Sequence, residues 1–121
     1  MHELSIAHSL VEIATEHVRA AGADSVRSLT LKLGALSCVH KSALEFSFEL
    51  VAKNTPLEGA VLHFIDVPVV VYCPQCACEV ELPGIQRFRC PQCDTPTAEI
   101  RSGRELDLQS LEIVQSDAAP A

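Results

Sequence analysis

Residues 73–93 read CPQCACEVELPGIQRFRCPQC, and this stretch decides how the rest of the chain is interpreted. The tetrapeptide Cys-Pro-Gln-Cys occurs in it twice, at residues 73–76 and again at residues 90–93. Two residues between paired cysteines let both sulfurs of one turn face a common ion, and two such turns supply four soft ligands. Four thiolates suit tetrahedral Zn²⁺ and leave it no open position. We therefore expect a structural, non-catalytic zinc site formed by Cys73, Cys76, Cys90 and Cys93.

The spacer between the two cysteine pairs has Pro83-Gly84 near its middle, and we expect it to fold back there as a short hairpin. Two disulfides or a redox pair are the alternatives to zinc, but a thioredoxin-like pair needs a neighbouring βαβ unit that the sequence lacks. Cys78 is interpreted as an extra thiol near the cluster, with exchange for one of the ligands as the alternative. Cys38 is interpreted as a small buried thiol.

Apolar residues before this segment recur with helical and then with strand periodicity. Residues 4–21 place their apolar side chains on one broad face at a spacing of 3.6 residues, and Gly22 follows as a stop signal. Residues 26–33 alternate between apolar and polar, which predicts a half-buried strand.

A second helix is predicted from Ser42 to about Lys53, because Ser42 and Glu45 have capping-box spacing. Its buried stripe would consist of Leu44, Phe48 and Val51. Phe46 and Leu50 widen the apolar surface. They are interpreted as additional core, and a partner surface is the alternative.

Strands are further predicted at residues 60–67 and from Leu106 to Ile113. The last of these has no hydrophobic partner inside the cysteine module, so we expect it to return to the earlier strands. The predicted fold is α+β, with two helices on a small mixed β-sheet and an inserted zinc-ribbon-like module. Its domains would be residues 1–67 with 103–114, the zinc-binding residues 68–102, and a flexible tail at 115–121.

Composition excludes several classes of function. The 121 residues carry a formal net charge of −7 and only 4% aromatic residues, which suits neither a phosphate backbone nor a base-stacking surface. No segment approaches the roughly 20 apolar residues of a membrane span, and the first 22 residues lack the apolar core of a signal peptide. We expect a cytoplasmic protein with reduced cysteines and, since no nucleophile–base motif or P-loop is present, no enzymatic activity.

The first three residues, Met1-His2-Glu3, can form a chelate. The Met1 amine and the His2 amide nitrogen close a five-membered ring, and His2 Nδ1 closes a six-membered ring with the same amide. Three nitrogens at the corners of a square suit Ni²⁺ or Cu²⁺ better than Zn²⁺. Most histidines at position two belong to solvated termini, and Glu3 also complements a helix dipole, so those readings stay open. Of the other histidines, interpreted as structural or solvated, His8 is the first choice for an auxiliary ligand.

Taken together, these motifs match a known family. The start Met1–Ile6, Gly34 after the first strand, the paired cysteine turns and the stretch Arg101–Leu106 resemble the HypA/HybF hydrogenase nickel-incorporation proteins. The resemblance covers residues 1 to about 114.

The resemblance implies a nickel metallochaperone for [NiFe]-hydrogenase maturation, with urease maturation as a further possibility. It implies that Met1, His2 and Glu3 bind nickel, that the four cysteines bind zinc, and that the partners are the GTPase HypB and the hydrogenase large-subunit precursor. A monomer or weak homodimer is expected. Since binding needs a neutral imidazole and a free amine, nickel should bind more weakly below about pH 6. The alternatives are a zinc-ribbon adaptor, a nucleic-acid-binding module or a redox enzyme.

Overall fold

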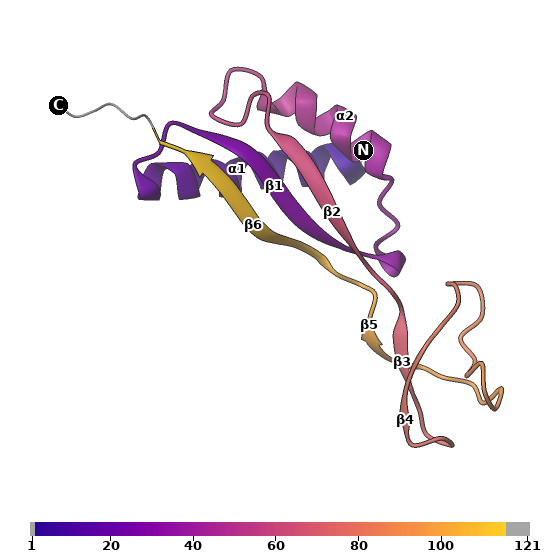
Figure 1. Cartoon of the computed structure of the whole chain (residues 1–121). Coiled ribbons are helices and arrows are strands. Elements are labelled where there is room, and N and C mark those ends of the chain that lie inside the picture. The colour runs from indigo at the N-terminus through magenta and orange to yellow at the C-terminus, as the bar shows by residue number, and fades with distance from the viewer. Residues whose placement is uncertain (1, 116–121) are drawn as a thin grey trace. The chain divides into compact units, whose positions relative to one another are not determined.

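The computed structural model describes residues 2–115, so Met1 and all but the first residue of the predicted tail lie outside the described residues (Figure 1). Two helices, one short 3-10 turn and six strands make up the described chain. In order they are α1 His2–Ala21, β1 Ser25–Gly34, η1 Ala35–Ser37, α2 Lys41–Ala52, β2 Val61–Val67, β3 Val70–Cys73, β4 Cys78–Glu81, β5 Glu99–Ser102 and β6 Leu106–Val114.

The described chain divides into two compact units. The first unit comprises residues 2–31, 39–63 and 108–115, and the second comprises residues 32–38 and 64–107. The strands form two three-stranded sheets of order β2-β1-β6 and β4-β3-β5.

The apolar face predicted for the first helix is the one that α1 buries. Ala7, Leu10, Val11, Ala14 and Val18 are all buried, and Figure 1 shows α1 and α2 on the same face of β1, β2 and β6. The helix ends as predicted, because Gly22 adopts a φ of +65° and its N–H donates to the Arg19 carbonyl at 3.1 Å. The N–H of Ala23 donates to the Val18 carbonyl at 3.0 Å, which completes a Schellman motif.

The last strand returns to the first strand, as predicted from the sequence. At the start of β1, the Asp24 N–H donates to the Val114 carbonyl at the end of β6, at 3.0 Å. Next to it, the Val26 N–H donates at 3.0 Å to the carbonyl of Pro56, which precedes β2. In Figure 1, β2 runs parallel to β1 and β6 runs antiparallel to it, so the sheet is mixed.

The start of α2 differs from the capping-box prediction. The helix begins at Lys41, and its N-cap residue is His40, whose side chain makes no capping hydrogen bond. Ser42 already lies inside the first turn, so the Ser42–Glu45 spacing does not mark the helix boundary.

The buried stripe of α2 is narrower than the sequence suggested. Leu44 and Phe48 are buried, as the helical periodicity predicted, whereas Val51 is only half-buried and its neighbour Ala52 is buried. The interpretation of Phe46 and Leu50 as additional core is wrong, since their exposed fractions are 65% and 49%. Both side chains lie on the side of α2 that turns away from the core.

The second unit has its own core, formed around the β3–β4 hairpin. Val71 pairs with Val80 on one side and with Ile100 of β5 on the other. The buried residues of this cluster are Val69, Val71, Cys73, Val80, Leu82 and Cys90. Two of the predicted zinc ligands therefore belong to the hydrophobic core of this unit.

The predicted hairpin at Pro83-Gly84 is wrong. The chain reverses earlier, because Cys73 pairs with Cys78 and the first Cys-Pro-Gln-Cys segment is itself the turn between β3 and β4. Ala77 closes this turn with a φ of +55°, and residues 82–88 contain no strand.

Among residues 2–115, neither helix is long and apolar enough to cross a bilayer.

Candidate metal centre

The four cysteine sulfurs of the two Cys-Pro-Gln-Cys turns lie together in the second unit. All four lie within 4.8 Å of one another. Cys93 Sγ is 3.5 Å from Cys73 Sγ and 3.6 Å from Cys76 Sγ, and Cys76 Sγ is 4.0 Å from Cys90 Sγ. A tetrahedral Zn²⁺ ion with bonds of about 2.3 Å holds its sulfurs about 3.8 Å apart. The donor set and its spacing therefore fit one tetrahedral, all-sulfur ion.

The two turns have the same backbone construction, as their identical sequences suggest. Each is followed by a residue with positive φ, which is Ala77 at +55° in the first turn and Asp94 at +61° in the second. In the second turn, the Asp94 N–H donates to the Cys90 carbonyl at 2.8 Å. The Cys90 N–H donates to the Thr95 carbonyl at 2.9 Å, so Thr95 occupies the place that Cys78 has in the first turn.

Two arginines hold the second turn in place from outside the cluster. Arg87 Nη2 donates to Asp94 Oδ1 at 2.8 Å, and Arg89 Nη1 donates to the Asp94 carbonyl at 2.7 Å. Arg89 also lies 3.6 Å from Asp94 Oδ2. Because Asp94 directly follows Cys93, these contacts help fix the position of a sulfur that the core itself does not bury.

Burial and hydrogen bonding make the four thiols unequal. Cys73 and Cys90 are buried, with exposed fractions of 0% and 2%, whereas Cys93 is exposed. Thr95 Oγ1 lies 3.1 Å from Cys93 Sγ, and the hydrogen bonds from the Thr95 side chain and backbone lower the pKa of Cys93. The pKa of Cys76 is raised, chiefly because its thiol hydrogen-bonds to Cys93. Thiols packed this closely oppose one another's ionisation, and a divalent cation bound among them would favour the loss of their protons.

The other two cysteines lie outside this cluster. Cys78 is exposed on β4 and does not belong to the group of four close sulfurs, which agrees with its interpretation as an extra thiol. The interpretation of Cys38 as a buried thiol is wrong, because Cys38 is exposed and has a φ of +60° where η1 ends. Cys38 therefore lies in a turn at the surface and contributes nothing to the core.

The described part of the N-terminal motif lies in the first unit, at the start of α1. The helix begins at His2, so both His2 and Glu3 are helical, and Met1 lies outside the described residues. The His2 side chain is 58% exposed, whereas that of Glu3 is only 17% exposed. Glu3 Oε2 accepts a hydrogen bond from the His40 N–H at 3.2 Å and lies 3.9 Å from His2 Nδ1. The hydrogen bond from His40 is the main reason that the pKa of Glu3 is lowered.

Each of the remaining histidines is exposed. His8 and His17 lie on α1, His40 precedes α2, and His63 lies on β2. None of them joins a group of three or more close metal-binding side chains among residues 2–115.

Three features of these sites were missed from the sequence. The Glu3–His40 hydrogen bond and the Arg87–Asp94 ion pair join residues of different segments or turns, and no local pattern marks them. Thr95 could have been noticed, because it follows the second cysteine pair at the position that Cys78 has after the first.

Comparison with known proteins agrees with these features. The family model described as "Hydrogenase/urease nickel incorporation, metallochaperone, hypA" matches residues 1–113. The hydrogenase maturation factor HypA of Chloroflexus aurantiacus is 51% identical over 112 residues, which cover 93% of this chain and 98% of the relative.

Solved structures show the same fold. The solution structure of a HypA protein has a TM-score of 0.72 at 26% identity and covers 96% of this chain and 98% of its own. The Ni metallochaperone HypA from Helicobacter pylori has a TM-score of 0.66 at 24% identity, over 94% of this chain and 98% of its own. Together with the match over residues 1–113, these likenesses show that the chain belongs to the HypA family of hydrogenase and urease nickel-incorporation metallochaperones.

Proposed function

We propose that this chain binds Ni²⁺ as cargo at Met1-His2-Glu3 and passes it to the large-subunit precursor of a [NiFe]-hydrogenase, together with the GTPase HypB. The four cysteines of the second unit hold a structural Zn²⁺ ion. The first unit carries the nickel and the second unit carries the zinc. Delivery to a urease is the alternative destination within the same family. Cysteines that bind zinc or stay unpaired, rather than forming disulfides, suit the reducing cytoplasm as the place of this transfer.

The start of α1 at His2 is the observation that best supports the nickel site. The first four N–H groups of an α-helix have no acceptor within the helix. The amide nitrogen of His2 can therefore lose its proton and bind a metal without breaking a helical hydrogen bond. The exposed His2 imidazole is accessible to the same ion.

Glu3 supplies the support for this terminus. Its carboxylate is held by the His40 N–H, which ties the first turn of α1 to the segment before α2. A chelate on Met1 and His2 is thus attached to folded structure on one side and exposed on the other. An exposed and incompletely filled ligand set allows a partner protein to offer further ligands and take the ion.

Zinc suits the second unit because the four sulfurs surround one point and two of them lie in the core. A closed tetrahedral thiolate shell has no vacant position for a substrate, so the ion stabilises the unit and takes no part in catalysis. Metal selection at the two sites then follows from ligand type, with sulfur in one and nitrogen in the other.

Nickel titration of the zinc-loaded protein tests the proposal. Isothermal titration calorimetry would compare the wild type with His2→Ala and with His8→Ala, which removes an exposed imidazole from the same helix. We expect His2→Ala to weaken nickel binding by at least about tenfold, and His8→Ala to leave it nearly unchanged. Equal nickel affinity of the wild type and His2→Ala would show that nickel does not bind at the N-terminal motif.

The proposed chelate requires an unblocked amine on Met1, and mass spectrometry of the purified protein shows whether this amine is free. Acetylation of this amine is expected to abolish the high-affinity site while the zinc content stays at one ion per chain. A protein that binds nickel equally well after acetylation would exclude the proposed chelate and leave the zinc assignment intact.

A further inference from the structure

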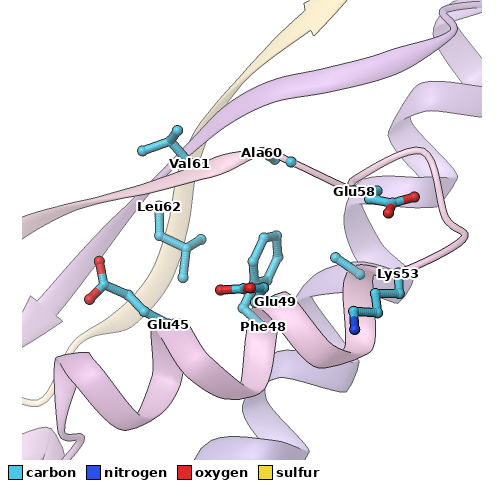
Figure 2. A pocket seen from close by; sticks show the side chains of 10 residues that line it. Glu45, Phe48, Glu49, Lys53, Glu58, Ala60, Val61 and Leu62 are labelled. Carbon is cyan, nitrogen blue, oxygen red and sulfur yellow. The ribbon is translucent and has the colours of Figure 1, made fainter.

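The first unit has a hollow between α2 and β2 that neither metal site uses. It has a volume of about 440 Å³ and is lined by Glu45, Phe48, Glu49, Ala52, Lys53, Glu58, Gly59, Ala60, Val61 and Leu62. Figure 2 shows Phe48 of α2 and Leu62 of β2 pointing into the space between the two elements. We call this hollow the α2–β2 groove.

The floor of the groove is apolar and firmly packed. Phe48, Ala52 and Leu62 are buried, so they belong to the core and form a fixed surface. At the rim, Val61 is 52% exposed although it is a large aliphatic residue. The groove thus offers a preformed apolar surface that one inserted side chain can cover.

The walls of the groove are acidic. Three carboxylates, Glu45, Glu49 and Glu58, face a single cation, Lys53, which lies at the opposite end of the lining from Glu45 (Figure 2). Glu58 Oε1 already accepts the Asn54 N–H at 3.3 Å. Within residues 2–115, the ion pairs of the structure involve neither Glu45 nor Glu49.

Glu45 and Glu49 are four residues apart, so they are neighbours on the surface of α2. Like charges at this spacing destabilise a helix. No ion pair within the described chain neutralises either carboxylate, but cations from another molecule would do so. The free charge therefore favours a positively charged occupant.

A strip of exposed apolar surface lies beside these carboxylates. Phe46 and Leu50 each follow one of the two glutamates and lie about 100° further around the helix. An occupant that reaches over Glu45 and Glu49 would also cover Phe46 and Leu50. Large apolar residues gathered next to a hollow are typical of protein-binding surfaces.

From this arrangement we propose that the α2–β2 groove is the docking site for a basic segment of a partner protein. One aliphatic or aromatic side chain of the segment lies on Phe48 and Leu62, and its Lys or Arg residues pair with Glu45 and Glu49. A second copy of this chain is poorly matched to the groove, because it carries 16 acidic and only 9 basic residues. The proposal does not depend on either metal site.

The test uses the full-length zinc-loaded protein and a phage-displayed library of random dodecapeptides. We expect the selected peptides to combine several Lys or Arg residues with one Leu, Ile, Phe or Trp. Their dissociation constants would be measured by fluorescence anisotropy with labelled synthetic peptides. Affinity should also fall with rising salt concentration, because the pairs lie at an exposed rim.

The decisive variant is the double substitution Glu45→Lys/Glu49→Lys. It should weaken peptide binding by at least about tenfold. The matched control is Glu12→Lys/Glu16→Lys on α1, which has the same spacing and the same change of net charge at exposed positions. This control should change the affinity by less than about twofold, and circular dichroism checks that both variants stay folded.

Three results would overturn the proposal. Selected peptides without an excess of basic residues would contradict the charge argument. Equal weakening by the two double variants would show that only net charge matters. A homodimer that Glu45→Lys/Glu49→Lys dissociates in sedimentation velocity would make a second copy the occupant.

Discussion

The carboxylate of Glu3, in the first turn of α1, accepts a hydrogen bond from the backbone N–H of His40, just before α2. These residues are 37 positions apart, and the contact joins the starts of the two helices. It explains why Glu3 is largely covered while its neighbour His2 is exposed. The two residues of the terminal motif thus differ in their surroundings, since His2 is open to a ligand and Glu3 is bound to the fold.

The Glu3–His40 hydrogen bond predicts a pH-dependent contribution to stability. Because the bond lowers the pKa of Glu3, the ionised carboxylate stabilises the folded state. This contribution is complete above the ordinary glutamate pKa of 4.5 and is lost as the pH falls through the lower folded-state pKa of Glu3. Nickel-free wild type should therefore be more stable than Glu3→Gln at neutral pH, and the difference should shrink below about pH 4.

Urea denaturation of both proteins from pH 7 to pH 3 measures this difference. Taking the difference between them removes the effect of acid on the cysteine cluster, which is the same in both. A gap between wild type and Glu3→Gln that stayed constant over this range would show that the carboxylate charge contributes nothing.

Patterns within one segment predicted most of the fold. The buried face of α1, the helix stop at Gly22 and the buried leucines of β1 depend on residues close in sequence, and each was predicted correctly. The alternation of β1 is broken at Ser28, a polar residue that the structure buries. The four cysteines were grouped correctly because the spacing within each pair fixes the geometry of its turn.

The errors arose where distant parts of the chain decide the outcome. The start of α2 was placed at a capping box, whereas the structure has His40 as the N-cap, held by Glu3 from another helix. Phe46 and Leu50 are as hydrophobic as core residues, but the position of the sheet determines which face of α2 is buried. Neither the Glu3–His40 contact nor the packing of α2 on the sheet can be predicted from the sequence of α2 alone.

Replacing a cluster cysteine should release zinc, whereas replacing Cys78 should not. In the proposed zinc site, Cys90→Ser would remove one of four ligands, so we expect loss of bound zinc and loosening of the unit at residues 32–38 and 64–107. Cys78→Ser is the matched control, because Cys78 lies in the same unit and outside the cluster.

Zinc content by inductively coupled plasma mass spectrometry and amide hydrogen exchange measure these two effects. Cys78→Ser should keep one zinc per chain and the exchange pattern of the wild type. One zinc per chain and normal protection in Cys90→Ser would show that this residue is not a ligand.

Two phenylalanines of α2 should differ sharply in their contribution to stability. Phe48 is 3% exposed, so Phe48→Ala should lower the free energy of unfolding by about 3–5 kcal/mol. Phe46 is 65% exposed, so Phe46→Ala should change it by less than about 0.5 kcal/mol. Urea midpoints of the two variants give the comparison, and a loss of several kcal/mol in Phe46→Ala would restore the core interpretation.

Gly34 should tolerate no side chain, and the reason is close packing within the second unit. A Cβ atom at Gly34 would overlap the carbonyl oxygen of Gly103 and lie 2.7 Å from the backbone nitrogen of Glu105. Both obstacles are backbone atoms, and the Gly34 N–H already donates to the Glu105 carbonyl at 2.7 Å. Gly34→Ala should therefore force the two segments apart and cost about 3 kcal/mol or more.

Gly22→Ala is the control that separates crowding from backbone conformation. Gly22 has a φ of +65°, and no atom lies within 4 Å of the place that a Cβ would take, so alanine there should cost only about 1 kcal/mol. The Leu36 N–H donates to the Gly103 carbonyl at 2.7 Å, so hydrogen exchange at Leu36 reports directly on the crowded contact. We expect Gly34→Ala to remove the protection of this amide and Gly22→Ala to preserve it. Equal protection of Leu36 in the two variants would show that the backbone at Gly34 and Gly103 can move apart to accommodate a methyl group. Close backbone approach would then not explain the glycine at position 34.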